Sequence, residues 1–131
     1  MRIFEPIARE TESVAKTIVD AALKVHQALG PGLLESVYEL CLTHDLTCRG
    51  MPLESQVVLP ITYKGLTIDA GLRLDIIVAK QVIVEVKSVE KMNPVFNAQL
   101  LTYLKLTGIR LGLLINFNVP VIRDGIKRIV L

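Results

Sequence analysis

The sequence has only two cysteines, no long apolar run and a formal net charge of just +2. No apolar stretch reaches the ~18 residues of a membrane span, so we expect no membrane crossing. Residues 1–6 lack the apolar segment of a secretory signal, and we therefore expect a cytoplasmic protein. Cys41 and Cys48 lie about 10 Å apart along a predicted helix, which is too far for a disulfide bond. They are interpreted as small packing side chains.

Motifs of several enzyme and binding classes are also missing. The chain has no Cys/His spacing typical of a zinc site, no Gly-rich phosphate loop and no nucleophile elbow. A net charge of +2 does not support an extended track for nucleic acid, so positive charge for that purpose would have to be concentrated locally. Arg123, Lys127 and Arg128 are candidates, and ordinary solvated side chains are an equally good interpretation of them.

The composition predicts a folded protein. Hydrophobic residues make up 51% of the 131 residues and charged residues 21%. A chain of this length can bury a sizeable core, and we expect one domain over residues 1–131.

Hydrophobic periodicity predicts an order of helix, helix, three strands, helix, strand, strand. The helices are expected at residues 11–29, 33–49 and 93–107, and the strands at residues 56–63, 66–70 continued by 72–79, 82–87, 109–116 and 126–131. The first helix is expected to pack through Val14, Ile18, Ala21, Ala22, Val25 and Leu29, and the second through Leu34, Val37, Cys41 and Leu42. The helix at residues 93–107 is long enough for a crossover between parallel strands. The expected class is α/β with α+β character, a mixed sheet flanked by helices.

Three charged residues interrupt two otherwise apolar strands. Asp75 lies in the strand at residues 72–79, and Glu85 and Lys87 lie in the strand at residues 82–87. Glu85 and Lys87 are two apart, so they project from the same face of their strand. Charges are costly in such surroundings unless they are paired or bind a metal. Carboxylates from adjacent strands can hold a hard cation such as Mg²⁺ and place the lysine beside it. The alternative is a cross-strand ion pair, such as Asp75 with Lys87.

Two helices offer further polar side chains. Glu35 lies at a helix start, where it can reach the same site or simply compensate the helix dipole. Tyr38 follows three residues later on the expected face of Glu35, and packing against the sheet is its alternative role. Gln99 and Tyr103 lie four apart, so they share one face of the third helix and could border the site.

These residues resemble a known signature. Asp75 followed by Glu85-Val86-Lys87 resembles the motif of the PD-(D/E)XK nuclease superfamily. Residues 32–38, Gly-Leu-Leu-Glu-Ser-Val-Tyr, are similar to the name-giving motif of the GxxExxY protein family, a branch of that superfamily. The resemblance extends from about residue 17 to the C-terminus. It implies a restriction-endonuclease-like αβββαβ core, in agreement with the order predicted from periodicity.

The resemblance also implies roles. Glu35, Asp75 and Glu85 match acidic positions that hold a divalent metal, with the Val86 carbonyl as a further oxygen. Lys87 matches the catalytic lysine. The helix residues Tyr38, Gln99 and Tyr103 are expected to bind substrate or border the site.

The leading hypothesis is a nuclease that uses Mg²⁺ or Mn²⁺ to hydrolyse phosphodiester bonds of nucleic acid, with DNA as the expected substrate. Both DNA and RNA stay open on the residues alone. The alternative is an inactive nuclease-fold module that binds nucleic acid or a protein partner. A third interpretation gives the charges only a structural role. Cutting both strands of a duplex with one site per chain would require a homodimer.

Overall fold

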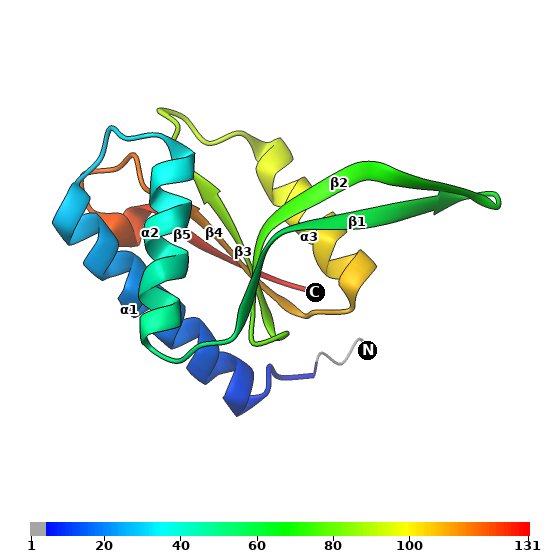
Figure 1. Cartoon of the computed structure of the whole chain (residues 1–131), viewed down its shortest axis with the longest axis horizontal. Coiled ribbons are helices and arrows are strands. Elements are labelled where there is room, and N and C mark those ends of the chain that lie inside the picture. Colours follow the sequence, from blue (N-terminus) through cyan, green and yellow to red (C-terminus); the bar gives the residue numbers. More distant parts are fainter. Residues whose placement is uncertain (1–4) are drawn as a thin grey trace.

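The structure, a computed structural model, describes residues 5–131; residues 1–4 of the N-terminal stretch considered above lie outside the described residues. Within that range the chain forms three α-helices and five strands, in the order expected from the sequence (Figure 1). They are α1 (Arg9–Leu29), α2 (Glu35–Cys48), β1 (Leu53–Tyr63), β2 (Leu66–Val78), β3 (Val82–Lys87), α3 (Pro94–Thr107), β4 (Leu111–Asn116) and β5 (Ile126–Val130), with a short 3₁₀ helix η1 (Ile122–Gly125) before β5. No helix among these is long and apolar enough to cross a membrane.

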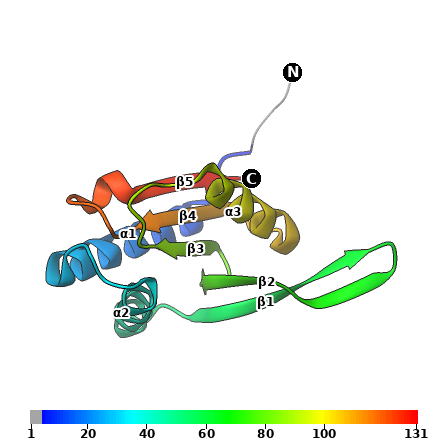
Figure 2. The ribbon, with the colours of Figure 1, turned by 90° about the horizontal axis from the view of Figure 1, so that it is seen from above.

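The strands form one mixed sheet in the order β1-β2-β3-β4-β5. β3 and β4 are parallel, and every other neighbouring pair is antiparallel (Figure 2). The helix α3 connects β3 to β4, which confirms the predicted crossover. It begins at Asn93, whose side chain accepts a hydrogen bond from the Val95 amide, and it ends at the left-handed Gly108.

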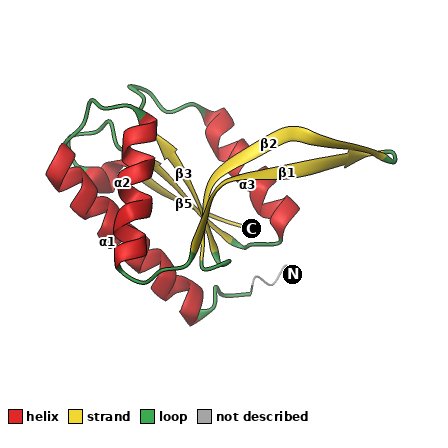
Figure 3. Cartoon of the chain, in the orientation of Figure 1, coloured by secondary structure: helices red, strands yellow, loops and turns green. Residues whose placement is uncertain are grey.

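Helices cover both faces of the sheet (Figure 3). Val84 and Val86 of β3 belong to the core on the side of α1 and α2. Ile83 belongs to the second core, on the side of α3, together with Leu100 and Leu104 of that helix. Because side chains alternate along a strand, Glu85 and Lys87 lie on the face of Ile83, which is the α3 side.

The packing face of α2 differs from the one expected. Its buried side chains are Tyr38, Leu42 and Leu46, which follow one another at a spacing of four. Leu34 is 73% exposed because it precedes the first helical turn in an extended conformation, and Val37 is exposed as well. Glu35 therefore lies on the solvent side while Tyr38 lies in the core, so the two do not share a face.

The stripe predicted for α1 is confirmed from Val14 to Val25. Leu29 is the exception, and it is exposed at the end of the helix.

The strands β1 and β2 continue beyond the rest of the sheet as a two-stranded arm (Figure 1). The segments 66–70 and 72–79 expected from the sequence form one continuous strand, β2. Near the base of the arm, two β2 side chains that are two residues apart pack on opposite faces of the sheet. Leu74 packs in the α3-side core, whereas Ile76 packs in the α1/α2-side core. Residues two apart on a regular strand share a face, so β2 is twisted at Asp75.

Candidate active site

Asp75 and Glu85 face each other where β2 and β3 separate. The strand pairing ends at Ile76 with Val84. Beyond that pair, the Asp75 amide donates a hydrogen bond to Glu85 Oε2 at 3.1 Å, and the Val86 amide donates to Asp75 Oδ2 at 2.8 Å. The two carboxylates thus replace the missing ladder bonds between the strands. Each carboxylate is positioned by the backbone of the opposite strand.

The carboxylate pair has no cationic side chain bonded to it. Glu85 is 6% exposed, yet the ion pairs of the described residues are Asp45 with Arg49 and Glu12 with Arg128, both elsewhere. The cross-strand ion pair of Asp75 with Lys87 that the sequence allowed is therefore not formed within residues 5–131. Two acidic groups beside each other without a counter-charge are a place where a cation is favoured.

The pKa of Glu85 reflects the lack of a cationic partner. Burial is the main cause that raises the pKa of Glu85 to about 9; the neighbouring Asp75 carboxylate contributes in the same direction, while the Asp75 amide and Lys87 act against the shift. The metal-free protein therefore holds a proton on Glu85 at neutral pH. A divalent ion that displaced this proton would find an acceptor-only carboxylate, which is a ligand that Mg²⁺ prefers.

Lys87 and Tyr103 lie on the same side of the sheet as the carboxylates. The Lys87 ammonium stands 4.4 Å from the centroid of the Phe96 ring, at the start of α3. Tyr103, farther along α3, is 5% exposed and its hydroxyl donates to the Arg73 carbonyl at 3.3 Å. Burial raises the pKa of Tyr103, and the nearby Glu85 and Asp75 carboxylates raise it further. The phenol is thus close enough to sense both acidic groups.

Two residues join this group that the sequence reasoning did not select. The Gln56 amide donates to both carboxylate oxygens of Glu39, at 2.9 and 2.8 Å. Burial raises the pKa of Glu39; the Gln56 amide lowers it, and the Asp75 and Glu35 carboxylates raise it. Gln56 stands opposite Asp75 in the pairing of β1 with β2, so its partner Glu39 lies near Asp75. A helical spacing of four from Glu35 was the available signal for Glu39, because residues at that spacing share a helix face.

The remaining predicted site residues are placed differently. Glu35 is exposed in the first turn of α2, on the side of Glu39. Gln99 is exposed on α3. Tyr38 was expected to border the site, but its side chain is fully buried. Its ring stacks on Phe117, with ring centroids 4.6 Å apart.

The Tyr38 hydroxyl fixes the loop between α1 and α2. It donates to the Gly30 carbonyl at 2.5 Å and accepts from the Leu33 amide at 3.1 Å. Tyr38 therefore positions the start of α2, the helix that carries Glu35 and Glu39.

No group of three or more His, Cys, Asp or Glu side chains within the described residues is arranged to hold a metal ion. The structure brings Asp75 and Glu85 together, with Glu39 near Asp75. The three-acid ligand set of Glu35, Asp75 and Glu85 stays a prediction.

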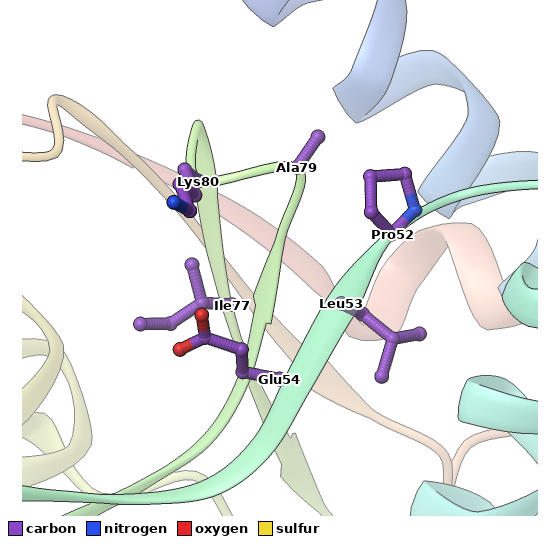
Figure 4. Close-up of a pocket in the computed structure, with 6 residues that line it drawn as sticks. All are labelled: Pro52, Leu53, Glu54, Ile77, Ala79 and Lys80. Carbon is purple, nitrogen blue, oxygen red and sulfur yellow. The ribbon is translucent and has the colours of Figure 1, made fainter.

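A separate pocket lies where β2 ends, at the turn into β3 (Figure 4). It has a volume of about 190 Å³ and is lined by Pro52, Leu53, Glu54, Ile77, Ala79 and Lys80. None of these is one of the predicted site residues, and its walls are mainly aliphatic. The carboxylate pair is therefore not at the bottom of this pocket.

Comparison with known proteins identifies the family. A sheet that carries Asp75 beside Glu85-x-Lys87 at the point where two strands separate is the arrangement expected from the motif. The sequence profile of the PD-(D/E)XK nuclease superfamily matches residues 12–129, and the chain belongs to that superfamily. Its mixed sheet flanked by helices is the restriction-endonuclease-like α+β fold expected from the sequence.

No curated protein matches the chain. Among solved structures, the crystal structure of SSO0001 is similar, with 25% sequence identity and a TM-score of 0.49. The match covers 91% of this chain and 57% of the SSO0001 chain.

Proposed function

We propose that the protein is a metal-dependent nuclease that hydrolyses phosphodiester bonds of nucleic acid, with DNA as the substrate. The observation that carries the proposal is the Asp75–Glu85 pair, which is held by the backbone of two strands and has no cationic partner among the described residues. The donor set fits Mg²⁺ or Mn²⁺, because both are hard ions that take carboxylate oxygens.

Each residue has a defined task in this proposal. Asp75 and Glu85 would hold the ion, with the Val86 carbonyl as a further oxygen donor. A bound divalent ion would supply charge neutralisation at the phosphate and a water of lowered pKa. Lys87 shares the sheet face of Glu85 and would stabilise the negative charge that develops on the phosphate. Its position over the Phe96 ring keeps the ammonium near the carboxylates without forming an ion pair with them.

The finer assignments belong to the same proposal. Residues 32–38 support membership of the GxxExxY branch within the superfamily. We also propose that residues 1–131 act as one nuclease domain and that a homodimer is formed when both strands of a duplex are cut. The cytoplasmic location expected from the sequence stays a prediction.

The test is cleavage of linear and circular DNA and of RNA with Mg²⁺ or Mn²⁺, compared with the same reactions in EDTA. We expect cleavage only with metal. Asp75→Asn should lose both Mn²⁺ binding, measured by calorimetry, and cleavage. Lys87→Met should keep Mn²⁺ binding while the cleavage rate falls by about 100-fold or more. A wild-type protein that cuts none of these substrates with either metal would contradict the proposal.

A binding module without turnover is the second candidate. The observation that favours it is the lack of a preformed three-acid metal group within residues 5–131. This candidate expects DNA affinity that is the same in EDTA and in Mn²⁺, with no Mn²⁺ binding to the protein alone. Fluorescence anisotropy with labelled DNA, run beside the calorimetry, distinguishes the two.

A further inference from the structure

A side-chain contact between Gln56 of β1 and Glu39 of α2 lies next to the candidate active site. The Gln56 side-chain amide donates to both oxygens of the Glu39 carboxylate, at 2.9 and 2.8 Å. The two residues are 17 apart in the sequence and come from different elements, so the contact is a tertiary one. An amide that reaches both oxygens fixes the orientation of the carboxylate, which one hydrogen bond would leave free to rotate.

Gln56 has an unusual backbone conformation at this point. Its φ is +52°, in the left-handed region that a glutamine seldom adopts. The pairs Ser55 with Ile76 and Val57 with Leu74 flank it, so Gln56 stands opposite Asp75, and the strand pairing is interrupted there. The strained residue of β1 is thus the one across from the candidate metal ligand of β2.

Glu39 is better placed than Glu35 to act with Asp75. Both are on α2 and four residues apart, but Glu35 is exposed in the first turn whereas Glu39 is half-buried. The Gln56 partner of Glu39 stands opposite Asp75, and the Asp75 carboxylate raises the pKa of Glu39 more than the Glu35 carboxylate does. No cationic side chain pairs with Glu39 among residues 5–131, where the ion pairs lie elsewhere.

We infer that Glu39 is the α2 carboxylate of the metal site and that Gln56 is a positioning residue that orients it toward Asp75. The inference rests on the proposed metal-dependent function and adds two residues that the sequence motif does not select. Gln56 acts on the ion only through Glu39. Such outer residues typically change metal affinity by about 10- to 100-fold when they are removed.

The test measures Mn²⁺ affinity by isothermal calorimetry on the full chain, with the thermal midpoint of the metal-free protein as a second readout. Gln56→Gly removes the amide but accepts the positive φ, so it separates the side-chain role from the backbone role. Glu39→Gln removes the carboxylate charge. The matched control is Lys80→Gly, because Lys80 also has a positive φ, +57°, and lies in the turn between β2 and β3.

We expect Gln56→Gly and Glu39→Gln each to weaken Mn²⁺ binding by about 10-fold or more, and the double variant to be no weaker than the worse single variant. Lys80→Gly should bind Mn²⁺ as the wild type does, and Glu35→Gln should weaken Mn²⁺ binding less than Glu39→Gln does. All variants should keep their metal-free thermal midpoint, and Gln56→Asn, which shortens the amide, should have an intermediate affinity.

The outcomes separate this inference from the proposed function. If Asp75→Asn abolishes Mn²⁺ binding but Glu39→Gln and Gln56→Gly do not change it, the inference is wrong and the nuclease proposal stands. If Mn²⁺ binding depends on all three residues but no nucleic acid is cut, the inference stands and the nuclease proposal is wrong. A wild-type protein without Mn²⁺ affinity overturns both.

Discussion

At the scale of single residues, Glu85 shows how a fold can change the chemistry of a side chain. The residue ends an apolar run of β3 and is 6% exposed, so its charged form has lost most of its hydration. Asp75 adds a second negative charge across the strand gap. A buried carboxyl group without a counter-ion keeps its proton, because burying the ionised form is costly. A bound divalent cation would offset the cost of burying the ionised form.

This proton gives the metal-free protein a defined pH dependence. The pKa of Glu85 rises from 4.5 in the unfolded chain to about 9 in the folded one, so the folded state holds more protons between these pH values. The free energy of unfolding should therefore fall as pH rises through this range, with the contribution of Glu85 fully present below pH 4.5 and lost above about 9.

Calorimetric thermal midpoints in EDTA from pH 6 to 9 check this expectation. The midpoint of the wild type should fall with pH more steeply than that of Glu85→Gln, whose side chain does not ionise. Glu90→Gln, at an exposed position, is the control and should keep the slope of the wild type. Parallel curves for all three proteins would show that Glu85 has no raised pKa.

Tyr38 illustrates a residue whose role is structural within a functional motif. Tyr38→Phe keeps the ring stacked on Phe117 but leaves the Gly30 carbonyl and the Leu33 amide without their partner. We expect the free energy of unfolding to fall by about 1–3 kcal/mol, because part-buried polar groups lose a hydrogen bond. Urea unfolding followed by circular dichroism measures it. Tyr63→Phe, at a side chain that is 63% exposed, should change nothing.

The sequence made the two strand carboxylates and the lysine predictable, because charges in apolar strands are conspicuous. It did not reveal Glu39 or Gln56. Their relation to Asp75 depends on how α2 packs against β1 and on a strained φ at Gln56, and neither leaves a periodic pattern. Tyr38 was selected as a site residue because it belongs to the motif. Its burial was not predicted, because it depends on which face of α2 packs against the sheet.

At the scale of elements, the position of α3 on the sheet determines where Tyr103 approaches the carboxylates and where Phe96 meets Lys87. Gly112 in β4 permits this approach, because a Cβ at that position would lie 2.9 Å from Leu100 Cδ1 and Cγ. Gly112→Ala should lower the free energy of unfolding by about 1–3 kcal/mol through overpacking.

A double-mutant cycle identifies the cause. In combination with Leu100→Ala, the cost of Gly112→Ala should shrink, since the clashing atoms are then removed. Gly71→Ala is the comparison, because its Cβ would approach the Ile61 side chain, on the arm and away from α3. Chemical denaturation of the four variants provides the energies. A cycle that is strictly additive would rule out the Leu100 contact as the source of the cost.

The number, type and order of the elements followed from periodicity and from the caps at Asn93 and Gly108. The extent of β2 was not predicted in full, because the expected segments 66–70 and 72–79 left out Gly71, whereas β2 is continuous through it. The glycine is accommodated there because the Ile61 side chain occupies the space of its missing Cβ. Sequence alone could not show this, since Ile61 belongs to the opposite strand.

At the scale of the whole molecule, the arm of β1 and β2 stands apart from the two cores (Figure 2). Leu59 and Leu72 are the last directly paired residues that pack against the α3-side core. Beyond them Tyr63 and Leu66 are mostly exposed, at 63% and 61%. A two-stranded hairpin contributes little stability by itself in water, so the distal arm should add little to the stability of the fold.

Shortening the arm tests whether its distal part contributes to the stability of the fold or to metal binding. Replacing residues 60–71 by Asn-Gly joins Leu59 to Leu72 through a tight turn that suits their pairing. The thermal midpoint should change by less than about 5 °C, because few buried contacts are removed. Mn²⁺ affinity should stay within about twofold of the wild type, since Gln56 and Asp75 lie on the retained side and share no partner with the deleted residues. An unfolded product, or one that has lost Mn²⁺ binding, would show that the arm is required to hold β2 at the Asp75 twist, and that the carboxylate pair depends on the whole hairpin.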